Sequence, residues 1–127
     1  MPVRDAGAAA AFYRDRIGFT VVHQEDGFAI LRRDGAEVHL WQADDESWRD
    51  RDTIEKPVRS GAESFIAGTA SFRVMCAGVD ELWEELSRAG VLHPVSHDGV
   101  SATDYGTREA WATDDDGDLI TFFEPRG

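Results

Sequence analysis

The sequence passes twice through the same series of elements, and this internal repeat limits the possible folds more than any other feature. The segments "RDRIGF" and "LSRAGV" each end a predicted helix, and "DGAEVHLW" in the first half is echoed by "DGDLITFF" in the second. Self-similarity of this kind indicates one supersecondary unit that is used twice. We therefore predict two copies of a unit that contains one helix and three strands.

In the first copy, a helix is predicted between Asp5, which can cap its start, and Gly18, which can adopt the left-handed conformation that ends a helix. Strand-like runs follow at 19–23, 28–32 and 37–41, and "EDG" and "DG" provide the turns between them. The first copy is thus predicted to be a helix followed by three antiparallel strands.

The second copy begins with an additional predicted strand at 69–77. A helix follows, with Gly90 at its end, and then strands at 92–97, 108–113 and 119–124. Only Met1-Pro2-Val3 precedes the helix of the first copy, so its leading strand is expected to be short or missing. The chain either starts short or begins downstream of its natural start.

A β-α-β-β-β unit covers one face of its sheet with its helix and leaves the other face open. Two such units side by side can form a curved mixed sheet, a half-barrel with a concave inner surface that suits a ligand. The expected class is therefore α+β. The 127 residues fit one domain, with module one at about 1–42, a long loop at about 43–68 and module two at about 69–127.

Composition excludes several classes of function. The chain has 25 acidic and 13 basic residues, so its net charge of −12 would repel nucleic acid and attract a cationic small molecule, although such acidity also serves solubility alone. No apolar stretch reaches the ~20 residues of a membrane span. No secretory segment is evident, which indicates a cytoplasmic protein. Cys76 is the only cysteine and is predicted to be a buried thiol.

The segments "PVRDAGAAAAFYRDRIGF", "DGFAILRRDGAEVHLW", "VDELWEELSRAGV" and "YGTREAWATDDDGDLITFFE", in this order, resemble the vicinal oxygen chelate superfamily. That superfamily contains the glyoxalases, the fosfomycin-resistance enzymes and the bleomycin-resistance proteins. The resemblance implies the half-barrel fold described above. It also implies a symmetric homodimer, in which the binding grooves are built between two chains.

For the enzymes of the superfamily, the resemblance implies a divalent metal bound by His, Glu or Gln on the first and last strands of each repeat. The corresponding positions here are a missing strand, His39, Ser71 and Thr121. One ligand of four is too few for a catalytic metal, which needs about three protein ligands. Glu37 and Glu124 are expected to reach the metal-ligand positions in the cleft only after a one-residue shift in register. We therefore predict no metal, no cofactor and no catalysis of the family type, with His39 a hydrogen-bonded cleft or core histidine.

No other catalytic motif takes the place of the metal. The chain has no G-x-S-x-G, no Gly-rich phosphate loop and no evident Cys–His pair. The run 114–118, "DDDGD", resembles a calcium loop but lacks the downstream bidentate Glu at the required spacing. It is predicted to be a hairpin turn.

Aromatic side chains are predicted to line the cleft, although each of them could instead belong to the core. Bleomycin-resistance proteins place aromatic residues there to sandwich the planar bithiazole of the drug, and "YGTRE" resembles a family motif in which a Trp-Gly pair precedes Arg-Glu. Acidic residues at the rim would receive the positively charged tail of the drug. The predicted ligand-binding residues are Phe28, His39, Trp41, Asp44, Asp45, Trp48, Phe65, Tyr105, Arg108 and Trp111.

Three functions remain open from the sequence. The first is a non-catalytic protein that sequesters a glycopeptide antibiotic of the bleomycin type, or a similar planar cationic drug, and so confers resistance. The second is a metal-dependent enzyme of the same superfamily, of the glyoxalase, thiol transferase or dioxygenase type. The third is a ligand sensor or an immunity partner for another class of antibiotic.

Overall fold

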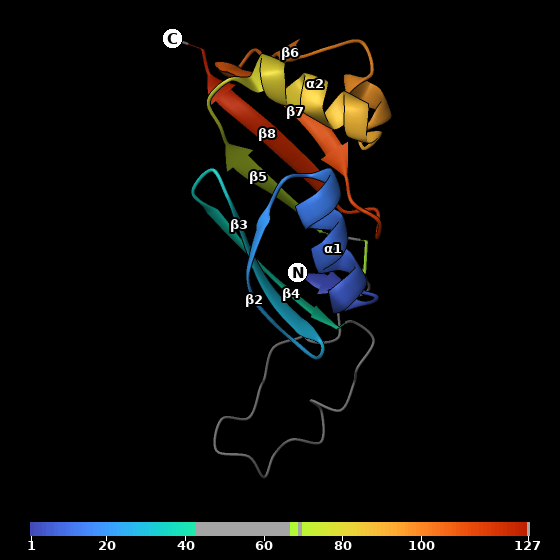
Figure 1. The fold of residues 1–127 in the computed structure, drawn as a ribbon. Coiled ribbons are helices and arrows are strands. Elements are labelled where there is room, and N and C mark those ends of the chain that lie inside the picture. Colours follow the sequence, from blue (N-terminus) through green and yellow to red (C-terminus); the bar gives the residue numbers. More distant parts are fainter. Residues whose placement is uncertain (43–66, 69, 127) are drawn as a thin grey trace.

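The computed structural model describes residues 1–42, 67–68 and 70–126, and Figure 1 shows the arrangement of their elements. The first half contains β1 (Pro2–Val3), α1 (Ala6–Arg16), β2 (Thr20–Glu25), β3 (Phe28–Arg33) and β4 (Ala36–Gln42). The second half contains β5 (Ser71–Met75), α2 (Val79–Ala89), the 3-10 helix η3 (Pro94–Ser96), β6 (Ser101–Ala102), β7 (Thr107–Thr113) and β8 (Leu119–Pro125). Most of the predicted loop, 43–66, lies outside the described residues.

The strands form two four-stranded sheets with the same internal order, β1-β4-β3-β2 and β5-β8-β7-β6. In each sheet the first strand of the module runs parallel to the last, and the remaining pairs are antiparallel. This pattern confirms the predicted repeat of β-α-β-β-β modules. The leading strand of module one is short, as predicted, and pairs Pro2 with Trp41 and Val3 with Gln42.

One predicted strand is wrong. The sequence predicted a strand at 92–97, but residues Pro94–Ser96 form η3, and the strand that pairs with β7 is β6. Pro94 has no N–H to give to a sheet, and its fixed φ suits the first turn of a helix. His93 caps that turn, because its Nδ1 accepts a hydrogen bond from the backbone N–H of Val95 at 3.1 Å.

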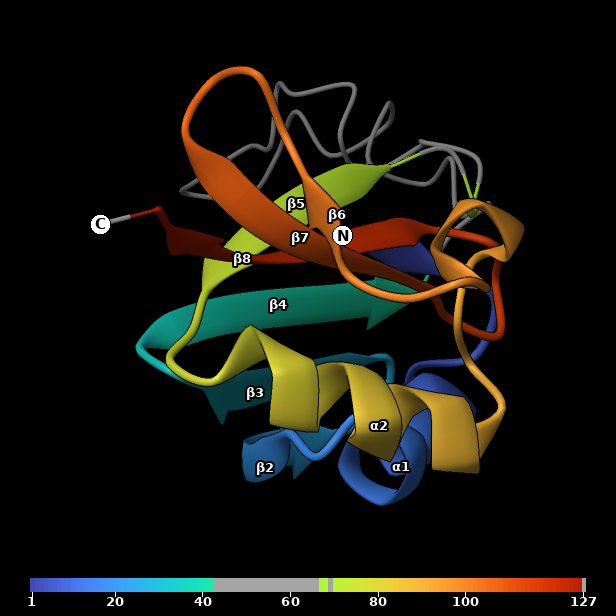
Figure 2. The ribbon, with the colours of Figure 1, turned by 90° about the horizontal axis from the view of Figure 1, so that it is seen from above.

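The two helices lie on the same side of the molecule, and the core lies between them and the sheets (Figures 1 and 2). Tyr13, Leu31, Leu40, Leu86 and Phe122 are among its fully buried members, so both modules share one core. Cys76 is buried, as predicted, and its burial raises the pKa of the thiol to about 11. No helix in the described part of the chain is long and apolar enough to span a bilayer.

Polar contacts fix the two modules relative to each other. Arg33 on β3 pairs with Glu85 on α2, with 2.9 Å between its Nη2 and the carboxylate oxygen. From α1, the hydroxyl of Tyr13 donates to Asp114 in the β7–β8 turn at 2.7 Å. The modules are therefore joined through their helix-covered faces, and no helix of residues 1–42 or 70–126 covers the opposite face of either sheet.

Candidate functional site

A groove runs between β4 and β5 on the side away from the helices. Its central hollow has a volume of about 350 Å³. The residues that line it are Met1, Ala36, Glu37, Val38, His39, Ser71, Phe72 and Arg73. A second hollow shares Ala36 and Arg73 with the first and extends along Met75 and Phe123. We call these two hollows together the β4–β5 groove.

The alternation of side chains along β4 decides what faces this groove. Val38 and Leu40 are buried toward the helix side, whereas Glu37 and His39 are exposed on the other side. Glu37 was expected to enter the site only after a shift in register, and that expectation is wrong. Residues two apart in a strand share a face, so Glu37 lies beside His39 without any shift.

On the bank formed by the first sheet, His39 and Phe28 are in direct contact. Their rings meet edge to face, with 5.6 Å between the centroids, and His23 lies 6.1 Å from Phe28 on its other side. Phe28 pairs with Trp41 across the β3–β4 ladder, so these two rings are on one face. The Nε2 atom of His39 lies 3.0 Å from a carboxylate oxygen of Glu37. This ring nitrogen is therefore engaged in a hydrogen bond with Glu37.

On the bank formed by the second sheet, a network of polar groups centres on Glu109, which is fully buried. Its Oε2 accepts hydrogen bonds from Arg73 Nη2 and Thr107 Oγ1, both at 2.7 Å. Its Oε1 accepts from the hydroxyl of Tyr105 and the indole N–H of Trp111, both at 3.1 Å. Burial opposes ionisation of the carboxyl group, but the hydrogen bonds outweigh it and keep the pKa of Glu109 below its usual value.

Arg73 connects the groove to this network. It lines both hollows, and its guanidinium also lies over the ring of Phe123 at 4.4 Å from the centroid. The β5-β8-β7 order places Arg73 across β8 from Glu109. Through Arg73, the rings of Tyr105 and Trp111 belong to the same surface as the groove.

Five of the residues predicted from the sequence lie on or beside the two sheets that flank the groove, and of these five His39 is the one that lines its hollows. Phe28, His39 and Trp41 lie on the first bank, and Tyr105 and Trp111 lie on the second. Four other predicted residues lie outside the described part of the chain. These are Asp44, Asp45, Trp48 and Phe65.

The placement predicted for Arg108 needs correction. Its guanidinium donates to both carboxylate oxygens of Asp80 on α2, at 2.7 and 2.8 Å, and to Glu124 on β8 at 3.1 Å. The hydrogen bonds that Arg108 donates to these carboxylates, above all to Asp80, raise its pKa. Arg108 alternates with Thr107 and Glu109, so it points to the helix side and ties α2 to the sheet.

Sequence reasoning did not select Arg73 or Glu109 for the site. The sequence did contain a signal, because alternate residues of a strand share a face, and Glu109 therefore lies on the same face as Trp111 in "TREAWAT". A charged residue in the middle of a strand, between Tyr105 and Trp111, which were both predicted to line the cleft, indicates a polar cluster on that face.

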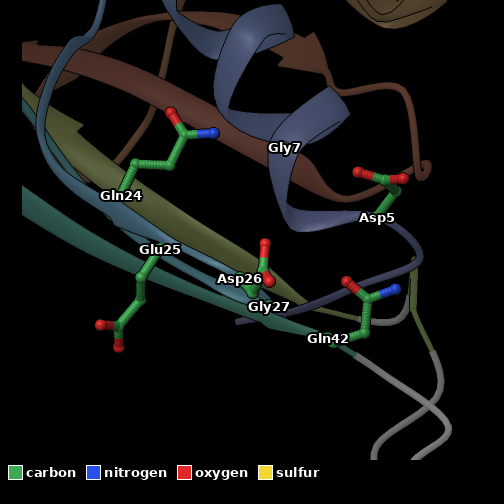
Figure 3. A pocket seen from close by; sticks show the side chains of 7 residues that line it. All are labelled: Asp5, Gly7, Gln24, Glu25, Asp26, Gly27 and Gln42. Carbon is green, nitrogen blue, oxygen red and sulfur yellow. The ribbon is translucent and has the colours of Figure 1, made fainter.

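A larger hollow than those of the groove lies elsewhere, at the start of α1 and the β2–β3 turn (Figure 3). It measures about 710 Å³ and is lined by polar residues and glycines without an aromatic ring. Two of these residues already serve α1, because Asp5 caps the N–H of Ala8 at 2.8 Å and Gln42 accepts from the N–H of Ala6 at 3.1 Å. Size alone therefore does not identify the site, and the chemistry favours the β4–β5 groove.

Three aspartates of the β7–β8 turn also gather in the interior. Carboxylate oxygens of Asp114, Asp116 and Asp118 lie within 4.8 Å of one another. Among residues 1–42, 67–68 and 70–126, this is the one group of three His, Cys, Asp or Glu side chains that are close enough together to hold a metal ion. Asp114 closes the turn by accepting from the N–H groups of Asp116 and Asp118 at 2.9 and 2.8 Å. The segment between β7 and β8 is thus a hairpin turn, as predicted.

Comparison with known proteins gives consistent results. The family model of the Glyoxalase/Bleomycin resistance protein/Dioxygenase superfamily matches residues 1–122. A bleomycin resistance protein from Geobacillus stearothermophilus is 45% identical over 126 residues, which cover 98% of this chain and 92% of that protein.

Two solved structures have the same fold. A lactoylglutathione lyase from Agrobacterium tumefaciens gives a TM-score of 0.71 at 19% identity and covers 98% of this chain and 88% of its own. A bleomycin-binding protein from Streptomyces verticillus, in complex with copper(II)-bleomycin, gives a TM-score of 0.62 at 22% identity. The match covers 95% of this chain and 88% of that protein. At these identities the likeness concerns the fold alone.

Proposed function

Since the chain belongs to the glyoxalase/bleomycin resistance protein/dioxygenase superfamily, we propose that it binds a bleomycin-type antibiotic, or a similar planar cationic drug, and sequesters it unchanged. The observation that carries this proposal is the β4–β5 groove with aromatic rings on both banks. The 45% identity to a bleomycin resistance protein over nearly the whole chain supports the choice of drug class.

The groove suits a flat ligand. Phe28 and Trp41 on one bank and Tyr105 and Trp111 on the other offer π-faces, and each stacked pair contributes ~0.5 to 1.5 kcal/mol beyond the burial of area. The net charge of −12 attracts a positively charged tail toward the protein. Asp44 and Asp45 remain the residues proposed to receive that tail, and Trp48 and Phe65 remain proposed contacts.

The side chains of the groove favour binding over metal-assisted catalysis. The ring nitrogen Nε2 of His39 contacts Glu37, and Ser71 and Thr121 stand at two of the other positions where the enzymes carry ligands. The one metal-compatible group in the described ranges, Asp114, Asp116 and Asp118, lies at the β7–β8 turn and shares no residue with the lining of the groove. We therefore propose that the protein acts without a metal and without turnover.

We further propose that the protein works as a homodimer in the cytoplasm. In the bleomycin-resistance proteins that the sequence resembles, two chains build the binding groove together. A symmetric pair places the same surface of each chain at the interface. Size-exclusion chromatography with light scattering is expected to give twice the mass of the chain, with and without the drug.

Calorimetric titration tests the proposed function. Protein dialysed against EDTA is expected to bind metal-free and copper-loaded bleomycin with Kd values of ~1 μM or tighter, which corresponds to about 8 kcal/mol. Mass spectrometry of the released drug should find it unmodified. Absence of both binding heat and a rise in melting temperature would contradict the proposal, and metal-dependent turnover of the drug would favour the enzymatic alternative.

Tyr105→Ala is expected to weaken bleomycin binding by at least ~1 kcal/mol, about fivefold, because it removes a stacking ring. The side chain of Tyr105 is 62% exposed, so the fold should survive its removal. Val22→Ala on β2 is the control, since Val22 is also exposed but lies on the strand of its sheet that is farthest from β4 in the order of pairing. Equal Kd values for Tyr105→Ala and the wild type would exclude Tyr105 from the site.

A further inference from the structure

The two carboxylate oxygens of Glu109 have different partners. Oε2 accepts from the charged Arg73 and from the hydroxyl of Thr107, whereas the partners of Oε1 within the described ranges are the two aromatic residues Tyr105 and Trp111. One atom of a fully buried carboxylate thus fixes two rings of the proposed drug site.

Stability alone does not explain a carboxylate at this position. Taking a charge out of water is costly even when a partner is present, and an apolar residue of similar size often serves the fold as well. On the same strand, Ala110 and Ala112 fill the helix-covered face with apolar groups. The bonds from Glu109 to two aromatic residues point instead to a role in orienting their rings.

Tyr105 depends most on this contact. It precedes β7 and its side chain is mostly exposed, so packing leaves its ring free to choose among several rotamers. The hydrogen bond from its hydroxyl to Glu109 selects one of them. A ring that is already oriented loses less conformational freedom when a ligand stacks on it, and binding becomes tighter without any new contact.

We propose that Glu109 is a positioning residue of the drug-binding groove, which holds the rings of Tyr105 and Trp111 in the orientation that receives a planar ligand. This proposal rests on the proposed function. The residue acts through the two rings and does not itself contact the ligand.

Tyr105→Phe is the sharpest variant for the binding test, because it keeps the ring and removes the hydroxyl that bonds to Glu109 and interacts with Arg73. We expect it to raise the Kd for bleomycin about threefold, and Glu109→Gln to raise it about tenfold, since an amide cannot accept from all four donors. In the Glu109→Gln background, Tyr105→Phe should have little further effect. Thr107→Val is the control, because it removes a donor to Oε2, while the bonds from the backbone of residue 107 to Thr103 still close the turn that carries Tyr105.

A second measurement needs no drug. In NMR spectra of the free protein, the indole N–H signal of Trp111, identified with Trp111→Phe, is expected to shift and to exchange faster with water in Glu109→Gln but not in Thr107→Val. An unchanged Trp111 signal overturns the inference whether or not the drug binds.

If the wild type binds bleomycin and both Tyr105→Phe and Glu109→Gln bind it equally well, the inference fails while the proposed function stands. If the wild type does not bind and the Trp111 signal responds as expected, the proposed function fails while the holding of the rings by Glu109 stands.

Discussion

Asp114→Ala is expected to lower the free energy of unfolding by about 4 kcal/mol. The side chain of Asp114 accepts from the hydroxyl of Tyr13 at 2.7 Å and from the backbone N–H groups of Asp116 and Asp118. All of these groups lie in the interior, and each buried donor left without a partner costs about 1–3 kcal/mol. The substitution would loosen both the β7–β8 turn and its junction with α1.

Urea unfolding followed by circular dichroism measures this loss. Asp115→Ala is the matched control, because Asp115 occupies the same turn but its side chain is exposed. Tyr13→Phe removes only one of the three donors, so it should cost about 1 kcal/mol. If Asp114→Ala and Asp115→Ala unfold at the same urea concentration, the contacts of Asp114 do not stabilise the fold.

Asp118→Asn is expected to stabilise the protein by about 2 kcal/mol at pH 7 to 8, and this gain should shrink as the pH falls through about 6 and disappear below about pH 4. Burial, followed by the carboxylate of Asp114 and the charge of Asp116, raises the pKa of Asp118 to about 6. One of its oxygens, Oδ2, has no hydrogen-bond partner among the residues that the structure describes, whereas the other accepts from the N–H of Ala70. The ionised form is therefore poorly accommodated.

The sign of this pH dependence follows from how tightly the folded and unfolded chains bind the proton of Asp118. The folded chain holds the proton of Asp118 more tightly than the unfolded chain does, so this group stabilises the fold at low pH, and the contribution is lost as the pH rises through about 6. Asparagine is neutral at every pH and can donate toward Asp114, so it keeps that contribution above pH 6. Below about pH 4 the aspartic acid is protonated in the folded and the unfolded chain alike, so the two proteins should become equal.

Thermal melts from pH 3.5 to 8 test the second prediction. Removing any negative charge from a chain with a net charge of −12 relieves repulsion, so Asp98→Asn, at a fully exposed position, is the necessary control. The gain from Asp118→Asn should exceed that control at pH 8 and match it at pH 3.5. A gain that is the same at all pH values would mean that titration of Asp118 is not its source.

The fold by itself does not decide between binding and catalysis. The lactoylglutathione lyase shares the architecture of this chain, and one fold often carries several functions. The choice depends on the residues in and around the groove, where His39 contacts Glu37 and each of the two flanking sheets carries aromatic rings. These side chains suit a planar ligand better than a coordinated ion.

Most of the fold could be predicted because it is encoded by local patterns. The repeated helix ends and turn residues placed both modules, and Gly18 adopts the positive φ of 73° that its position at the end of α1 required. The prediction failed at 92–97, where apolar residues suggested a strand. A proline and a capping histidine decided the outcome there, since their backbone preferences outweigh a weak apolar pattern.

The sequence determined the two modules, their order of elements and the aromatic residues available for a site, because periodicity and turn chemistry act over a few neighbouring residues. Tertiary structure alone decided which of these residues meet. Arg73 and Glu109 are 36 positions apart and join only because β8 lies between their strands, and Arg108 leaves the groove because α2 brings Asp80 to the other face. Strand order and helix placement fix which faces become neighbours, so the polar network behind the aromatic rings formed only when the chain folded.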